Sequence, residues 1–262
     1  MTDAPTPTRL REPEWITRAC AAEPRLPLMG PMMAYLLLML FADMAPAETP
    51  WNQVAIALHL VAAAWITWLF RHHWPRLGRA DLRIAIPVGL FAAWMWVAGQ
   101  HWLEGIQVGD ASLGGALGFS GSSPFVNLKP IEMKDVAEMY SGAGFWAHVV
   151  LKISRAMLIV PVVEELFWRG FLLRAFISWD RFDEVPLGRF TLFSFFGTAL
   201  LSVVQHPANW GVSILCWILF NAVFCWRKSL MCLFVTHGVT NLALYAYVVW
   251  ASFRGTNEWQ FW

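Results

Sequence analysis

The sequence predicts an all-α fold, a polytopic bundle of about seven transmembrane helices, from three observations. Hydrophobic residues make up 58% of the 262 positions and charged residues only 14%, whereas soluble domains are about 45 to 50% apolar. Apolar runs of about 20 residues, the length that crosses a bilayer core of ~30 Å, recur along the chain. Lys and Arg gather in alternate connections between these runs. The net charge of +1 creates no general basic field, so no nucleic-acid partner is expected.

Seven apolar segments are predicted to span the membrane. The fourth is the least sharply bounded, because Gly142 to Ile153 is also apolar and could form an interfacial helix or extend the span. The fifth is short. The predicted spans are 27–45, 52–70, 83–103, 150–175, 190–206, 211–226 and 229–252.

The basic residues test this topology independently, because cytoplasmic connections hold most of the Lys and Arg near span ends. Fourteen of the 19 basic residues fall on connections that share one side of the predicted bundle. They are Arg9, Arg11, Arg18, Arg25, Arg71, Arg76, Arg79, Arg83, Arg169, Arg174, Arg181, Arg189, Arg227 and Lys228. The other side has Lys129, Lys134 and Arg254, with Lys152 and Arg155 near the start of the fourth span. The amino terminus is therefore predicted inside and the carboxyl terminus outside.

This topology divides the chain into four segments. A cytoplasmic amino-terminal segment covers 1–26, and the first three transmembrane helices with a long external loop cover 27–149. A helical core at 150–252 is followed by an external tail at 253–262. The external loop contains a Gly-rich stretch, 114–121, that matches no phosphate-binding pattern and follows no strand. We therefore expect a flexible loop there and no nucleotide cofactor.

Two adjacent carboxylates lie in the interior of the fourth span, at Glu164 and Glu165. An ionised side chain at membrane depth costs about 2.5 to 3.5 kcal/mol, so such a pair implies a function or a partner. Arg169 follows Glu165 by four residues on the same helical face and can pair with it. Glu164 points about 100° away and stays available. The alternative interpretation is an ion cluster that only stabilises helix packing.

Two histidines and an asparagine add polar groups to later spans. His206 ends the fifth span just before Pro207, where an ordinary interfacial histidine is the alternative. His237 and Asn241 lie four residues apart on one face of the seventh span. An imidazole beside a carboxamide supplies donors that can stabilise an oxyanion, and the alternative is an interhelical hydrogen bond.

These motifs resemble the CAAX-protease and bacteriocin-processing (CPBP) family of intramembrane proteases, which includes the type II CAAX prenyl endopeptidases. The segment Glu164-Glu165-Leu-Phe-Trp-Arg169 matches the EExxxR motif of that family. The segment His237-Gly-Val-Thr-Asn241 matches its HxxxN motif.

The family's intervening FxxxH motif is half present. His206 matches its histidine, but Ser202 stands at the phenylalanine position. The resemblance covers about residues 150 to 245, so the segment 150–252 is predicted to be a CPBP-like catalytic core.

The resemblance implies catalytic roles for four residues, namely Glu164, His206, His237 and Asn241. The glutamate would act as a general base that activates a water molecule with help from the first histidine. The second histidine and the asparagine would stabilise the tetrahedral oxyanion. Glu165 and Arg169 would orient the site.

The expected function is that of an intramembrane endopeptidase acting on a membrane-associated peptide or protein, with membrane lipid around it. In a bacterium its location would be the cytoplasmic (inner) membrane. The resemblance implies no cofactor, but one Glu with two His could also hold zinc, so a divalent metal stays open. The alternative is a non-catalytic membrane-binding or sorting-accessory protein that retains the protease fold, which Ser202 favours. A transporter is disfavoured by the lack of internal repeats.

The predicted site carries a geometric requirement. If the fifth span begins at Arg189, His206 lies ~25 Å along it, near the outer face, whereas His237 lies nearer the inner face. A site shared with Glu164 then requires a tilted helix, a later start of the fifth span, or broken helices around a water-filled cavity.

Overall fold

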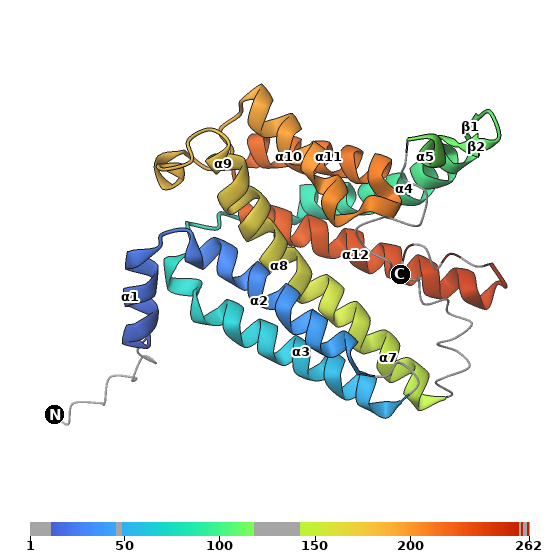
Figure 1. The fold of residues 1–262 in the computed structure, drawn as a ribbon, viewed down its shortest axis with the longest axis horizontal. Coiled ribbons are helices and arrows are strands. Elements are labelled where there is room, and N and C mark those ends of the chain that lie inside the picture. Colours follow the sequence, from blue (N-terminus) through green and yellow to red (C-terminus); the bar gives the residue numbers. More distant parts are fainter. Residues whose placement is uncertain (1–11, 46–48, 118–141, 257, 259–260, 262) are drawn as a thin grey trace.

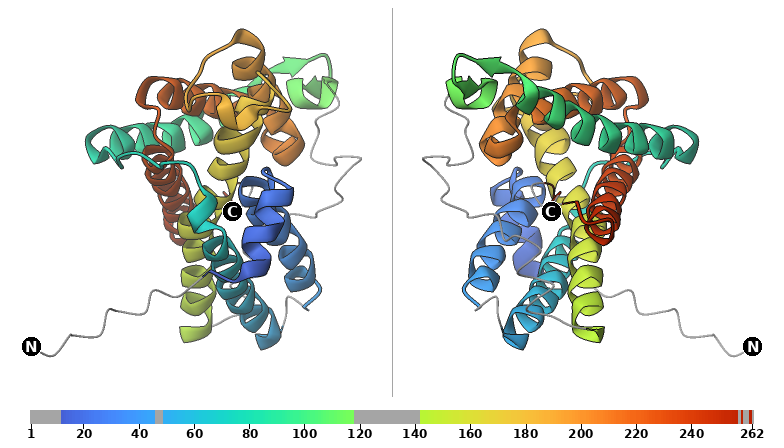
Figure 2. Two further views of the ribbon diagram at one scale, coloured as in Figure 1. Left: turned by 90° about the vertical axis from the view of Figure 1, so that its left-hand side faces the viewer. Right: turned by 90° about the vertical axis from the view of Figure 1, so that its right-hand side faces the viewer.

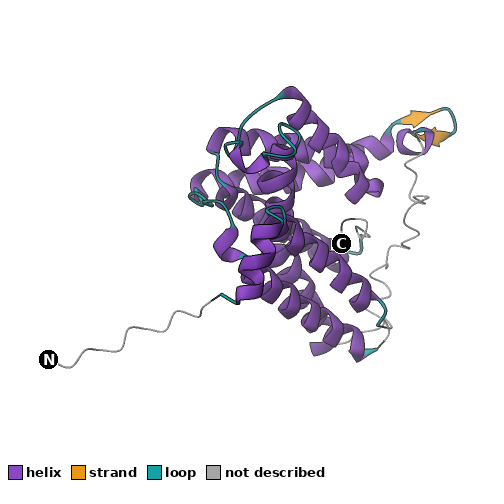
Figure 3. Ribbon diagram, turned by 60° about the vertical axis from the view of Figure 1, so that its left-hand side comes forward, coloured by secondary structure: helices purple, strands orange, loops and turns teal. Residues whose placement is uncertain are grey.

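The computed structural model describes residues 12–45, 49–117, 142–256, 258 and 261. Most of these residues are helical (Figure 3), and loops connect the helices; β1 (Gln107–Val108) and β2 (Ala111–Ser112) form an antiparallel hairpin. The α-helices are α1 (Glu14–Ala22), α2 (Leu26–Asp43), α3 (Pro50–Leu69), α4 (Leu82–Gly105), α5 (Leu113–Ala116), α7 (Ala143–Ser154), α8 (Val160–Glu165), α9 (Leu173–Ala175), α10 (Leu192–Gln205), α11 (Trp210–Arg227) and α12 (Leu230–Phe253). The 3₁₀ turns are η1 (Arg71–His73), η4 (Phe182–Glu184) and η5 (Pro207–Asn209), and the π-helical turns are η2 (Arg155–Ile159) and η3 (Leu166–Leu172).

Six helical stretches of the described chain are long and apolar enough to cross a membrane, and α10 is a shorter apolar helix. The six are Leu26–Asp43, Pro50–Leu69, Leu82–Gly105, Ala143–Ala175, Pro207–Arg227 and Leu230–Phe253. These helices confirm the predicted all-α polytopic fold. The fourth span begins earlier than predicted, because the apolar residues 142–153 mostly continue the same helix. Most of the predicted external loop, including Lys129, Lys134 and the end of the Gly-rich stretch, lies outside the described residues.

The helices form two groups joined by one long helical stretch (Figure 1). In the first group α2 packs against α3, and α7 packs beside α3. In the second group α12 packs along α4, and α10 packs along α11 (Figure 2). The segment α8 lies in the middle of the stretch from α7 to α9 and contacts both α2 and α12. Its side chains therefore lie at the junction of the two groups.

The stretch from Ala143 to Ala175 is interrupted by the two π-helical turns, η2 before α8 and η3 after it. Pro161, in the first turn of α8, has no backbone N–H and cannot continue the hydrogen-bond ladder of the preceding turn. π-helical turns are frequently found at functional sites. Here they bracket the two adjacent glutamates.

The helix α10 begins at Leu192, later than the predicted fifth span, and ends at Gln205. Thr191 caps its first turn by accepting a hydrogen bond from Ser194 N at 3.2 Å, and Pro207 follows its last turn. The connection before it is held by Arg174, whose Nη1 donates to Val185 O at 3.3 Å. With 14 residues, α10 is only ~21 Å long. It starts later than the predicted span, so its carboxyl end lies less deep than a start at Arg189 would place it.

The predicted orientation can be tested with single cysteines in a variant that lacks the four native cysteines. We expect Arg76→Cys, in the connection between α3 and α4, to react with a membrane-impermeant maleimide only after cells are opened. Asp110→Cys, in the turn of the β hairpin, should react in sealed cells. Mass-tag gel shifts would measure both reactions. Labelling of position 110 only in opened cells would reverse the predicted topology.

Candidate active site

The centre of the site is an ion pair sealed inside the protein. Glu165 ends α8 and Arg169 follows in η3, and neither side chain is exposed. Arg169 Nη1 donates to Glu165 Oε1 at 3.0 Å, so the pairing expected from the four-residue spacing is formed. Removing one member of such a buried pair would leave an uncompensated charge.

Asn221 of α11 holds the other edge of the arginine. Its Oδ1 accepts from Arg169 Nε at 3.0 Å, and its Nδ2 donates to Thr198 Oγ1 at 2.9 Å and to Phe195 O at 2.8 Å. Both ends of this fully buried amide are therefore used. The network connects the α10–α11 hairpin to the helix that carries the ion pair.

The buried polar residues share one depth because neighbouring helices run in alternating directions. Four of them lie six or seven residues from the helix end on the same side, and these are Arg169, Thr198, Asn221 and His237. At a rise of 1.5 Å per residue this distance is about 9 to 10 Å. The four helices therefore contribute to a single polar layer.

His237 of α12 is a second partner of Glu165. Its Nδ1 lies 2.9 Å from Glu165 Oε1, and because an ionised carboxylate only accepts, Nδ1 carries the proton and donates. The other ring nitrogen, Nε2, lies 4.0 Å from Glu164 Oε2. Glu165 therefore determines how the imidazole presents its second nitrogen to Glu164.

Glu164 has one carboxylate oxygen held and one open. Its Oε1 accepts a hydrogen bond of 2.5 Å from Gln205 Nε2, while Gln205 Oε1 accepts from Trp168 Nε1 at 3.0 Å. Its Oε2 is buried and has no hydrogen-bond partner among the described residues. The open oxygen is the one that faces His237.

His206 follows Gln205 directly and borders the same cluster. Its ring lies 5.2 Å from that of Trp96 and 5.5 Å from that of Trp217, between centroids. The Trp217 ring also has the Arg169 guanidinium 5.2 Å from its centroid. Within the described contacts, α10 reaches Glu164 through Gln205, and His206 packs on the tryptophans beside it.

Asn241 lies one turn after His237, and its amide supports the broken helix. Its Nδ2 donates to Ala156 O at 2.7 Å. In η2 the backbone N–H of Val160 bonds to Arg155 O, so it does not serve Ala156 O. Pro161, the next possible donor, has no N–H. The asparagine therefore satisfies a carbonyl that the main chain leaves without a donor.

Ser202, which stands where the family motif has phenylalanine, lies inside the α10–α11 hairpin. It is fully buried, it donates to Ala199 O at 2.7 Å, and it accepts from Ser213 Oγ at 2.6 Å. The serine thus makes a hydrogen bond between two helices where a phenylalanine could only pack.

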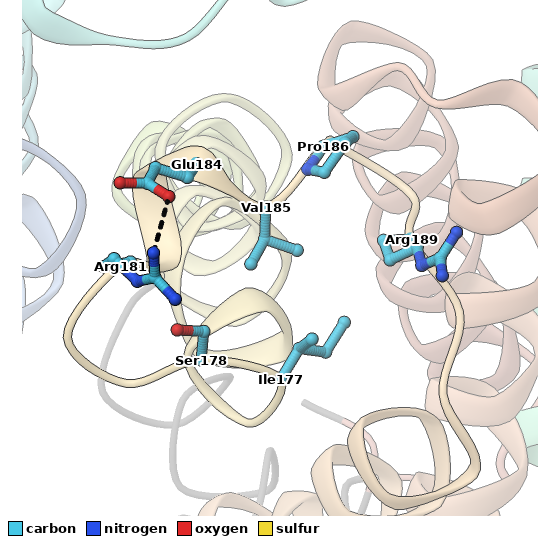
Figure 4. Close-up of a pocket in the computed structure, with 7 residues that line it drawn as sticks. All are labelled: Ile177, Ser178, Arg181, Glu184, Val185, Pro186 and Arg189. Carbon is cyan, nitrogen blue, oxygen red and sulfur yellow. Dashed lines mark ion pairs between the residues drawn. The ribbon is translucent and has the colours of Figure 1, made fainter.

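Two hollows lie on the described surface, and neither coincides with the buried polar cluster. No group of three or more His, Cys, Asp or Glu side chains in the described ranges is arranged to hold a metal ion. A surface pocket of about 260 Å³ lies on the α9–α10 connection between Ile177 and Arg189, where Arg181 pairs with Glu184 at 3.6 Å (Figure 4). A mostly apolar hollow of about 440 Å³ lies between α4 and α12. Neither is lined by the buried carboxylates.

Three residues of the network were missed by the sequence analysis. Asn221 is a lone amide within apolar α11, a position that could have indicated an interhelical hydrogen bond. Gln205 directly precedes the motif histidine, and no sequence motif predicts a role for it. Thr198 gives no signal, because a threonine within a helix commonly bonds its own backbone.

Residues 146–243 match the Rce1-like family, described as type II CAAX prenyl endopeptidase Rce1-like. The match begins in α7 and ends in α12, so it contains the two glutamates, the arginine, both histidines and the asparagine. It covers nearly the same segment as the resemblance seen in the motifs. Searches of curated proteins and of solved structures gave no match. The long apolar helices indicate an integral membrane protein, and residues 146–243 are similar to the CAAX-protease type.

The ion pair makes a prediction about stability. Glu165→Ala should lower the free energy of unfolding by about 3 to 5 kcal/mol, because Arg169 would keep a buried and unpaired charge. Replacing both partners, as Glu165→Leu with Arg169→Met, should cost less than the single change. Thermal unfolding of the purified variants in one detergent would give the order. A double variant that is less stable than Glu165→Ala would contradict this account.

The contact between Asn241 and Ala156 makes a second prediction. Asn241→Ala should lower stability by about 1 to 3 kcal/mol, because it leaves a buried carbonyl without a donor. Pro161→Ala restores a backbone N–H next to that carbonyl, so the same asparagine change should cost clearly less in the Pro161→Ala background. Unfolding of the two single variants and the double variant measures this coupling. Strictly additive losses would show that the two residues act independently.

Proposed function

We propose, from the match of residues 146–243 to the Rce1-like family of type II CAAX prenyl endopeptidases, that the protein is a glutamate-dependent intramembrane endopeptidase. Its substrate class is a membrane-associated peptide or protein, and in a bacterium its location is the cytoplasmic membrane. The observation that carries the proposal is the open, buried Oε2 of Glu164 beside the imidazole of His237.

In the proposed reaction Glu164 takes a proton from a water molecule, whose oxygen then attacks the carbonyl carbon of the scissile bond. The resulting tetrahedral oxyanion accepts hydrogen bonds from His237 and Asn241. The proton held by Glu164 passes to the nitrogen of the leaving amine when the carbon–nitrogen bond breaks. His206 assists in positioning the water.

The two glutamates have different surroundings, and these favour Glu164 as the base. One oxygen of Glu165 already accepts hydrogen bonds from Arg169 and His237, so this carboxylate is committed to charge balance. The held oxygen of Glu164 is bound by a neutral amide. Each carboxylate keeps one buried oxygen without a hydrogen-bond partner among the described residues, so the two differ in what binds the other oxygen. Protonating Glu164 during the reaction therefore breaks no ion pair.

The donors assigned to the oxyanion are compatible with the contacts that they already make. His237 donates from Nδ1 to Glu165, so when it is protonated on both nitrogens it can also donate from Nε2. The Asn241 amide gives one hydrogen to Ala156 O and keeps a second.

The rival proposal is a non-catalytic protein that uses the same polar cluster for binding. The serine in place of the motif phenylalanine was its sequence argument. Ser202 makes a contact between α10 and α11, which supports a local packing role for this departure from the motif.

The catalytic proposal predicts that Glu164→Gln lowers the cleavage rate by about 10²-fold to 10⁴-fold, because the amide cannot take the proton from water. The variant should accumulate in membranes at the level of the unaltered protein, since no buried countercharge is stranded. The readout is cleavage of a prenylated peptide ending in a Cys-aliphatic-aliphatic-X sequence, together with a mass comparison of membrane peptides with and without the protein. Glu258→Gln, which changes a carboxylate bound to His101 and Tyr247, is the matched control and should cleave normally. Normal cleavage by Glu164→Gln would refute the assignment of the base.

A further inference from the structure

One buried contact of Glu164 belongs to none of the family motifs. It is the hydrogen bond from Gln205, a residue of α10 that precedes the motif histidine. Resting on the proposed function, we infer that Gln205 is a positioning residue, the middle member of a chain from Trp168 through Gln205 to Glu164 that selects which oxygen of the base meets water.

The direction of the amide follows from the chemistry of its two partners. An indole nitrogen can only donate a hydrogen bond, so Trp168 must face the amide oxygen of Gln205. An ionised carboxylate can only accept, so Glu164 must face the amide nitrogen. Only one orientation of the side chain satisfies both contacts.

The anchor of this chain is rigid. Trp168 is buried, its ring lies 5.6 Å from that of Trp217, and the ring of Phe167 lies at 5.4 Å. Trp168 also follows Glu164 by four residues in the same helical stretch. Gln205 therefore closes a loop between two positions one turn apart, and it fixes the carboxylate relative to the helix that carries it.

The consequence is a division between the two oxygens of Glu164. Oε1 is held at 2.5 Å by Gln205, and Oε2 is left without a hydrogen-bond partner among the described residues, 4.0 Å from His237 Nε2. A glutamate has a soft terminal torsion, and without the amide its carboxylate would turn freely. A general base requires a fixed approach to the proton that it removes, so this rotation would reduce the turnover rate more than substrate binding.

The alternative is that Gln205 has only a structural role and links α10 to the fourth span. Loss of such a link would lower stability but would not lower kcat while leaving KM unchanged. The coupling between Trp168 and Gln205 also differs between the two accounts. If the tryptophan acts on the base only through the glutamine, its loss adds nothing once the glutamine amide is gone.

The test uses the full protein in lipid vesicles with the prenylated Cys-aliphatic-aliphatic-X peptide as the probe. Gln205→Met keeps the length of the side chain and removes both hydrogen bonds, and we expect kcat to fall about 10-fold to 100-fold while KM changes less than about 2-fold. Trp168→Phe should lower kcat in the same way but less, because the amide donor remains. The double variant should have the kcat of Gln205→Met. The inference would be overturned if Gln205→Met kept the kcat of the unaltered protein. It would also be overturned if the losses in kcat of the two single variants added fully in the double variant.

Two matched controls and one reference variant separate the possible failures. Gln53→Met removes another partly buried glutamine, one that donates to Gly144 O at 2.9 Å, and Trp146→Phe changes an exposed indole, so both should keep normal kcat. Glu164→Gln is measured beside them. If it is inactive while Gln205→Met is normal, the positioning role is wrong and the proposed function stands. If it is fully active, both are wrong. Should Gln205→Met fail to fold, Trp168→Phe alone decides, and normal kcat there would overturn the chain.

Discussion

The rest of the core depends on the ion pair between Glu165 and Arg169. Each charge alone at membrane depth would cost about 2.5 to 3.5 kcal/mol, so the two must stay together. Other helices supply partners for some of their remaining hydrogen-bond groups, while Glu165 Oε2 and Arg169 Nη2 have none among the described residues. Asn221 provides an acceptor for the arginine from α11, and His237 provides a donor for the glutamate from α12. Because these contacts come from three helices, a shift of one residue in any of them would rotate its polar group by about 100° and break the network. The pair therefore sets the register of the helices around it.

The π-helical turn η2 near the ion pair also fixes the register of α12. Where η2 meets α12, a Cβ added to Gly238 would lie 2.8 Å from Met157 O, a distance that an alanine could not tolerate. This close approach lets the Asn241 amide reach Ala156 O, which Pro161 leaves without a donor. A strictly regular helix would satisfy its own carbonyls and would offer α12 nothing to bind. The broken helix thus holds the turn of α12 that carries His237 against Glu165.

The two adjacent glutamates show how neighbouring carboxylates acquire different roles. Their side chains leave the helix in directions about 100° apart, so each meets a different set of helices. Glu165 accepts from Arg169 of η3 and from His237 of α12, and Glu164 accepts from a neutral amide at the end of α10. The difference is one of partners and not of burial, because both side chains are almost completely enclosed.

The sequence by itself determined the membrane class, the apolar spans, the motif residues and the pairing of Glu165 with Arg169. These features are local, since they follow from hydrophobic length and from a spacing of four residues on one helix. It did not reveal that Gln205 binds Glu164, that Asn221 accepts a hydrogen bond from Arg169, or that Asn241 donates to Ala156 O. Those partners lie tens of residues apart in the chain. Which of them meet depends on where α10 starts, on the two π-helical turns and on how closely α12 approaches η2, and only the packed helices decide these relative depths and rotations.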